Sequence, residues 1–179
     1  MPNQLKKILV IYKSKYGSTR QYAEWIANDL KADLVDVSTI KVKDLLRYDV
    51  IIFGGFLHAV GISGLKIITD NFKEIMDKKI IVFAVGCSPK REDAISHVSS
   101  NNFTEEMKEK ISFFYLRGAF NYEKLDLLDK MMMKALRVKL EKKNKEDLDE
   151  DSKGLLACYD SPVNWTNINA IIPIVQRAR

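Results

Sequence analysis

Residues 7–19 read KILVIYKSKYGST, and this stretch decides the fold class. Its first half, residues 7–12, is a short apolar run without alternation, which predicts a strand buried on both faces. Helical spacing begins after the polar loop, because one face of a helix over 18–31 would carry Tyr22, Trp25, Ile26 and Leu30. A buried strand, a loop and a helix in this order predict the first unit of a parallel sheet.

The rest of the chain repeats this alternation. Apolar runs predict strands at 33–37, 49–54, 79–86 and 112–119, and stripes of apolar residues predict helices at 64–76 and 123–142. The polar stretch 88–104 is expected to hold a loop and a short helix start, and 144–154 a loop. Ser161 followed by Pro162 predicts the start of a final helix through Ile174. We therefore expect a single α/β domain over residues 1–179, with helices on both faces of the sheet.

Composition narrows the class of protein. The chain has 179 residues, 46% of them apolar, and a formal net charge of +5. Its two cysteines, Cys87 and Cys158, form no CxxC pattern, so neither a disulfide framework nor a metal site is expected. The first apolar run is too short for a signal peptide, and no run reaches the roughly 20 residues of a membrane span. These features predict a cytoplasmic protein.

The first loop has the chemistry of a phosphate site. Three hydroxyl side chains and one glycine lie where a strand ends and a helix begins: Ser14, Ser18, Thr19 and Gly17. Neutral donors and the free N–H groups of a helix start suit a phosphate. The alternative is an ordinary helix cap, which serine and threonine also favour. Neither GxxxxGK[ST] nor GxGxxG is present, which argues against a nucleotide P-loop and a dinucleotide fingerprint.

At this point the sequence resembles the flavodoxin-like family. SKYGST at 14–19 is similar to the phosphate loop of that family, [ST]-x-[TY]-G-x-[ST]. The segment YDVIIFGGFLHAVG at 48–61 resembles its second flavin loop. The resemblance implies a three-layer sandwich with a five-stranded parallel sheet of order 2-1-3-4-5 and a long helical insert after the last strand.

The same resemblance implies non-covalently bound FMN. Its phosphate would lie on residues of the first loop, with Lys15 a weaker ligand: Ser14, Lys15, Tyr16, Gly17, Ser18 and Thr19. Ring contacts would come from the second and third loops: Gly55, Phe56, Leu57, His58, Gly86, Cys87 and Ser88. In many relatives a glycine follows the alanine of the second loop, whereas here Val60 follows Ala59 and the glycine comes at Gly61. Since a β-branched residue resists positive φ, the loop is expected to turn one residue later or differently.

Within the superfamily, the C-terminal part resembles the menaquinone-dependent protoporphyrinogen dehydrogenase group. That resemblance rests on RGAFNYEKLDLLDKMMMKALRVKLEKK at 117–143 and NWTNINAIIPIV at 164–175. It implies an oxidoreductase that passes electrons from a reduced organic substrate, a porphyrinogen being one candidate, to a quinone or another acceptor. Two other roles stay open: a one-electron carrier between redox proteins, and a flavin-free binding module.

Several residues have two interpretations at this stage. His58 is either a proton donor to reduced flavin or a polar loop residue, and Cys87 is either reactive or a small packing residue. The helix at 123–142 is either a core helix with a basic end or a Met-rich contact surface for a substrate, a partner or a membrane. Met131, Met132 and Met133 are consecutive, so at least one should be exposed. A homodimer is a further option, and no nucleic-acid motif accompanies the positive charge.

Overall fold

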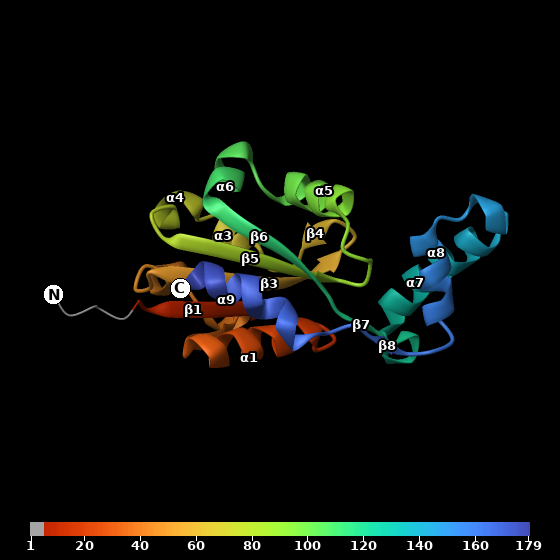
Figure 1. The fold of residues 1–179 in the computed structure, drawn as a ribbon, viewed down its shortest axis with the longest axis horizontal. Coiled ribbons are helices and arrows are strands. Elements are labelled where there is room, and N and C mark those ends of the chain that lie inside the picture. Colours follow the sequence, from red (N-terminus) through yellow and green to blue (C-terminus); the bar gives the residue numbers. More distant parts are fainter. Residues whose placement is uncertain (1–5) are drawn as a thin grey trace.

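The computed structural model describes residues 6–179 and shows a central sheet with a helical extension at one end (Figure 1). Five parallel strands pair in the order β2-β1-β3-β5-β6. A short strand, β4, pairs antiparallel with the end of β3. The bounds are β1 (Ile8–Lys13), β2 (Asp33–Asp36), β3 (Val50–His58), β4 (Gly61–Ile62), β5 (Lys79–Gly86) and β6 (Ile111–Arg117). The predicted order 2-1-3-4-5 is confirmed for the five parallel strands.

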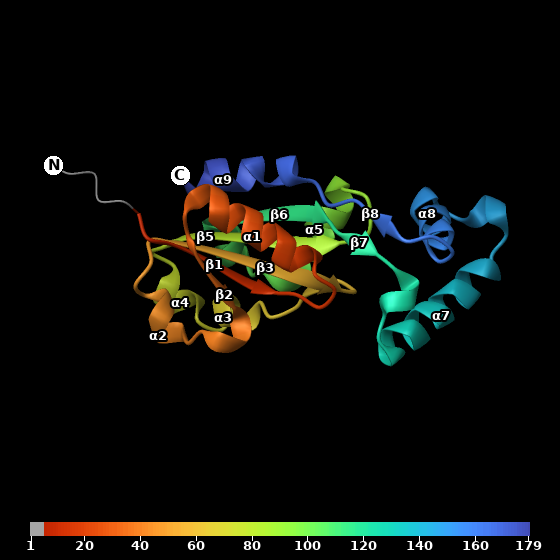
Figure 2. The same ribbon diagram turned by 90° about the horizontal axis from the view of Figure 1, so that it is seen from below.

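Helices cover both faces of this sheet (Figure 2). One face carries α1 (Ser18–Leu30) and α9 (Ile172–Ala178), which pack on Val10, Ile52 and Phe83. The other face packs on Leu9, Ile11 and Phe53. Its helices are α3 (Lys66–Thr69), α4 (Phe72–Ile75), α5 (Glu92–Asn102) and α6 (Glu105–Lys110), with η1 (Val37–Thr39) and α2 (Val42–Leu45) at the β2 edge. Alternate residues of β1 thus enter different cores, as expected of a strand buried on both sides.

The helical extension lies between two short strands that close its base. These strands, β7 (Ala119–Phe120) and β8 (Val163–Asn164), pair antiparallel. Between them come η2 (Tyr122–Lys124), α7 (Leu127–Glu141), η3 (Lys145–Asp147) and α8 (Glu150–Cys158). Tyr159 joins the two helices, because its hydroxyl donates to the Met133 carbonyl at 2.7 Å. The predicted insert after the last strand is confirmed.

Two predicted helices are divided or longer than expected. The helix expected at 64–76 is split into α3 and α4 at Asn71, whose φ of −114° and ψ of 16° leave the helical range. The stretch 88–104 contains the whole of α5, whose 11 residues make a longer helix than the predicted short start. Another helix, α6, follows it, because the Thr104 side chain accepts from the N–H of Met107 and caps a new helix.

Residues 144–179 differ more from the structure that the sequence predicts. Residues 144–154 are not a loop throughout, since Asp149 caps α8 by accepting from the N–H of Ser152 at 2.7 Å. Ser161 and Pro162 do not open a helix: they precede β8 in an exposed turn. The last helix instead begins after η4 (Ile168–Ile171) and continues to Ala178. The Ser-Pro pattern is typical of a turn as well as of a helix start. Here the next residues form β8 and pair with β7, so Ser161 and Pro162 lie in a turn.

Candidate functional site

The first loop joins β1 to a helix whose N-terminus is open. Gly17 is the N-cap of α1 with φ of 100°, a value that favours glycine. No side chain caps α1, and its first intrahelical bond runs from Gln21 to the Gly17 carbonyl. Within residues 6–179, no acceptor takes the N–H groups of Ser18, Thr19 and Arg20. The loop therefore offers a row of free backbone donors at a positive helix end.

Two serine hydroxyls of this loop keep their protons available. Ser14 Oγ accepts from the N–H of Gly17 at 3.2 Å, and Ser18 Oγ accepts from the N–H of Ala119 at 3.0 Å. Because each oxygen is used as an acceptor, each hydroxyl proton can be donated to a ligand. Thr19 is buried under the loop, with 2% of its surface exposed. The structure thus places Ser14, Gly17 and Ser18 in one loop with the buried Thr19, and phosphate binding by these residues stays a prediction.

Lys15 and Tyr16 form bonds with the start of α7. Lys15 Nζ lies 2.8 Å from Asp126 Oδ2 and 2.7 Å from Asp129 Oδ2. The Tyr16 hydroxyl donates to Asp129 and accepts from the N–H of Asp126 at 3.2 Å. The bonds with Asp126 and Asp129 raise the pKa of Lys15. The bond from Lys15, and to a smaller extent the bond from Tyr16, lowers the pKa of Asp129. A phosphate here would depend on hydroxyl and N–H donors, since two carboxylates already engage the loop lysine.

The second loop is a tight hairpin between β3 and β4. His58 pairs with Gly61, and Ala59 takes φ of 54° between them. The turn therefore uses Ala59, not the glycine at position 61, and Val60 avoids positive φ. Asn102 of α5 holds this turn by donating to the Val60 carbonyl at 2.6 Å and accepting from Ile62 at 2.9 Å.

The predicted ring contacts of this hairpin differ in accessibility. Phe56 and Leu57 are half-buried and His58 is exposed. Gly55 is buried, and a Cβ on it would lie 2.6 Å from the Ser63 carbonyl oxygen. Packing within the hairpin therefore explains why position 55 is a glycine. Phe56, Leu57 and His58 are the residues of this loop that a ligand can reach.

The third loop follows β5 and is held by β6. A Cβ on Gly86 would lie 2.6 Å from the Tyr115 hydroxyl, so glycine is required by packing. Burial raises the pKa of the Cys87 thiol, which favours the packing interpretation over a reactive thiolate. Ser88 is exposed at the carboxyl end of β5. In an open parallel sheet, ligands bind at the carboxyl ends of the strands, where the connections after two neighbouring strands run to opposite faces of the sheet.

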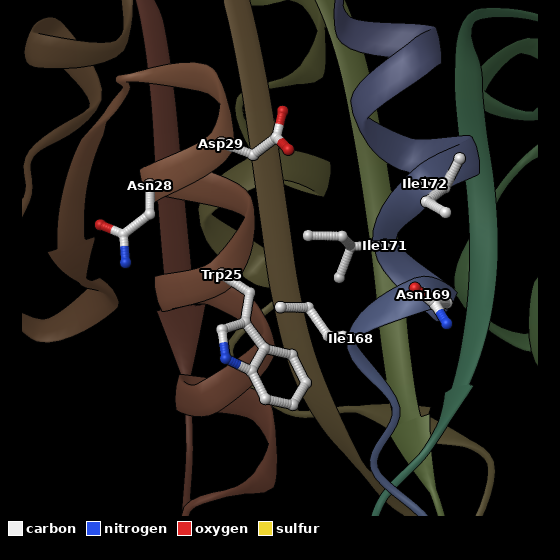
Figure 3. A pocket seen from close by; sticks show the side chains of 7 residues that line it. All are labelled: Trp25, Asn28, Asp29, Ile168, Asn169, Ile171 and Ile172. Carbon is white, nitrogen blue, oxygen red and sulfur yellow. The ribbon is translucent and has the colours of Figure 1, made fainter.

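A separate surface pocket lies on the face of α1 and η4, away from the three loops (Figure 3). It has a volume of about 390 Å³, and Trp25 lies across it from Ile168. Trp25 is half-buried, because its indole packs edge-on against Tyr22 and also lines this pocket. Nothing in its lining resembles the donor row of the first loop.

A comparison with protein-family models matches the flavodoxin domain to residues 9–148. The chain belongs to the flavodoxin domain family. Flavodoxin domains bind FMN, so membership indicates FMN as the cofactor. A search of curated proteins found no match.

Solved flavodoxin-fold structures also match this flavodoxin-domain chain. The Trp repressor binding protein from Bacillus subtilis is 21% identical with a TM-score of 0.47, over 63% of this chain and 83% of that one. Oxidised Flavodoxin 1 from Bacillus cereus is 20% identical with a TM-score of 0.46, over 62% and 84%. Two-electron reduced Megasphaera elsdenii flavodoxin is 20% identical with a TM-score of 0.47, over 62% and 85%.

The residues present fit FMN. The open N-terminus of α1 and the two serine protons suit a phosphomonoester, and the exposed side of Phe56 and Leu57 offers an apolar surface for a ring. Sequence reasoning did not assign a role to Asp126, Asp129 or Arg117. Arg117 could have been noticed as a charged residue at the carboxyl end of a strand, whereas the two aspartates come from a segment whose placement no local pattern predicts.

Proposed function

We propose that the protein is an FMN-dependent oxidoreductase of the protoporphyrinogen dehydrogenase-like kind, which passes electrons from a reduced organic substrate to a quinone or another acceptor. The observation that carries the proposal is the position of the helical extension. Its helix α7 begins at the phosphate loop, where Asp126 and Asp129 contact Lys15. An apolar, partly exposed segment next to a flavin site suits an organic substrate, which a simple electron carrier does not need.

FMN, when bound, supplies the redox chemistry by accepting electrons at its ring and passing them on. The chain's own residues bind and orient it. The N–H groups of Ser18 and Thr19 and the protons of Ser14 and Ser18 would hold the phosphate. Phe56 and Leu57 would cover the ring, and the exposed His58 would donate a proton to the reduced cofactor.

We also propose that α7 forms a contact surface for a quinone-containing or anionic bilayer. Most of its apolar side chains are strongly exposed: Leu127 (78%), Leu128 (64%), Met131 (62%) and Met132 (45%). The expected exposure of at least one methionine is therefore confirmed, and only Leu140 of α7 is buried. Lys134 and Lys139 on the same helix are exposed, and such a pairing of apolar and basic side chains favours an anionic surface. None of the helices in the described part of the chain has the length and apolar run that spanning a bilayer requires.

The proposed reaction is tested with FMN-loaded protein under anaerobic conditions. Porphyrinogens and other reduced organic compounds are supplied with a menaquinone analogue, and product and quinol are measured together. Oxidised product and quinol formed in the ratio that balances their electrons, and lost in a protein without FMN, support the enzyme. Transfer of electrons only to redox proteins, with no organic product, would instead establish the one-electron carrier.

A further inference from the structure

Two side chains of β6 hold consecutive carbonyl groups of the third loop. Arg117 Nη2 donates to the Cys87 carbonyl at 3.2 Å, and the Tyr115 hydroxyl donates to the Ser88 carbonyl at 2.8 Å. The two donors are two residues apart and therefore lie on the same face of the strand. The backbones are also joined there, because the N–H of Gly118 donates to the Gly86 carbonyl at 2.8 Å. Hydrogen bonds from β6 and the residue after it thus fix the orientation of the first peptide units after β5.

This orientation fixes the direction of one N–H group. Peptides of residues 6–179 are all trans, so each N–H points opposite to the carbonyl of its own peptide unit. Since the Cys87 carbonyl faces Arg117, the N–H of Ser88 is directed away from β6. The strand on the other side of β5 is β3, which carries the second loop. No acceptor in the described part of the chain takes the N–H of Ser88, which leaves a free donor at the ligand edge of the sheet.

Arg117 itself is rigidly held and lacks a counter-ion. Its guanidinium lies 4.0 Å from the centre of the Trp165 ring, and the N–H of Trp165 donates to the Gly118 carbonyl at 3.1 Å. Arg117 Nε is buried without a partner, and no carboxylate of residues 6–179 forms an ion pair with this side chain. A half-buried cation without a counter-ion lowers the stability of the folded protein unless a negatively charged group approaches it.

We propose that Arg117 is a positioning residue for FMN. It orients the Cys87–Ser88 peptide so that the N–H of Ser88 donates to an acceptor at the edge of the ring, and its charge favours the reduced, more negative cofactor over the oxidised one. The inference rests on the proposed function, because it requires FMN that cycles between two redox states. It extends that function by assigning control of the potential to a residue on the neighbouring strand.

The first test compares two arginine variants. Arg117→Met removes the bond to Cys87 and the charge, while Arg47→Met removes one charge at a side chain that is 74% exposed, in the turn before β3. For Arg117→Met, the dissociation constant of reduced FMN should rise about tenfold more than that of oxidised FMN, as loss of one charge-assisted bond implies. That ratio makes the midpoint potential about 30 mV more negative for a two-electron couple. Arg47→Met should leave the potential unchanged.

Arg117→Lys separates orientation from simple packing. Lysine keeps the charge and a donor for the Cys87 carbonyl, so most of the wild-type potential should return even though the planar stack on Trp165 is lost. Equal weakening of both redox forms in Arg117→Met, with an unchanged potential, would overturn the proposal.

The second test uses the wild-type protein and so does not depend on how a variant folds. Exchange of the Ser88 amide proton with water is measured by NMR with and without FMN. Binding should slow this exchange about tenfold or more, as expected of a newly formed hydrogen bond. Unchanged exchange in FMN-loaded protein would overturn the role of Arg117 while the proposed function stands, whereas failure of the wild type to bind FMN would overturn both.

Discussion

Lys15 Nζ lies 2.7 Å from Asp129 Oδ2, although the two residues are 114 positions apart in the sequence. The contact attaches the helical extension to the loop that would hold the cofactor phosphate. Tyr16 strengthens the junction by donating to the same carboxylate. One cluster of four side chains, those of Lys15, Tyr16, Asp126 and Asp129, therefore joins the flavodoxin sheet to the segment that follows its last strand.

This junction should loosen in acid. Bonds from Lys15 and Tyr16 lower the pKa of Asp129 below its ordinary value of 3.8, and the pKa of Asp126 is lowered by the N–H of Asp129 and then by Lys15. A carboxylate of this kind stabilises the folded state above its ordinary pKa, and the contribution is lost as the pH falls through the lowered value. The protection factors of α7 amides, which correct for the slower intrinsic exchange in acid, should therefore fall below about pH 4.

Asp129→Asn should accelerate exchange of α7 amides already at pH 7, because the charge that holds Lys15 and Tyr16 is removed. Lys153→Gln provides the matched control, since Lys153 pairs with Glu150 within α8 and does not contact the loop. Equal exchange in wild type and Asp129→Asn would mean that packing alone holds the extension in place.

The serine hydroxyls should contribute directly to phosphate binding. Ser14→Ala combined with Ser18→Ala should weaken FMN binding by about 2–4 kcal/mol, because two donors to a charged group are lost. Ser38→Ala is the control, since its hydroxyl donates to Asp36 at the end of β2. Isothermal titration with FMN measures the effect, and equal affinities in the double variant and the control would place the phosphate elsewhere.

Gly17 should be required for its backbone angle. The space where a Cβ would lie is open, but φ of 100° is strained for any other residue by about 1–2 kcal/mol. Gly17→Val should therefore fold and purify without flavin. Gly154→Ala, in the open interior of α8, should keep its flavin and be up to about 1 kcal/mol more stable. Flavin absorbance and thermal unfolding of the two purified variants decide the point, and a yellow Gly17→Val protein would refute it.

The exposed face of α7 should bind anionic bilayers. Met131→Glu places a charge on that face and should reduce co-sedimentation with anionic liposomes, and added salt should weaken wild-type binding. Ile172→Glu changes a residue of similar exposure on α9 and should have no effect. Equal sedimentation with neutral and anionic liposomes would contradict a charge-assisted surface.

The sheet could be predicted because its central strands β1, β3 and β5 are continuous apolar runs. The donor row of the first loop could be predicted because its residues are adjacent in the sequence. The resemblance predicts a helical insert after the last strand, but no local pattern predicts the structure within it. Asp149 begins α8 within a polar stretch, and the strand pair β7–β8 depends on residues far apart in the chain. For the same reason the roles of Asp129 and Arg117 depend on contacts with residues 15 and 87, which no local pattern reveals.

Calorimetric titration of the apoprotein with FMN, riboflavin, FAD and NAD tests the central claim most directly. The loop has one glycine and a set of hydroxyl and N–H donors, which suits a terminal phosphate better than a pyrophosphate. We expect FMN to bind at one site, riboflavin to bind far more weakly because it lacks the phosphate, and FAD and NAD not to bind. Riboflavin affinity equal to that of FMN would contradict the account, because the first loop would then hold no phosphate.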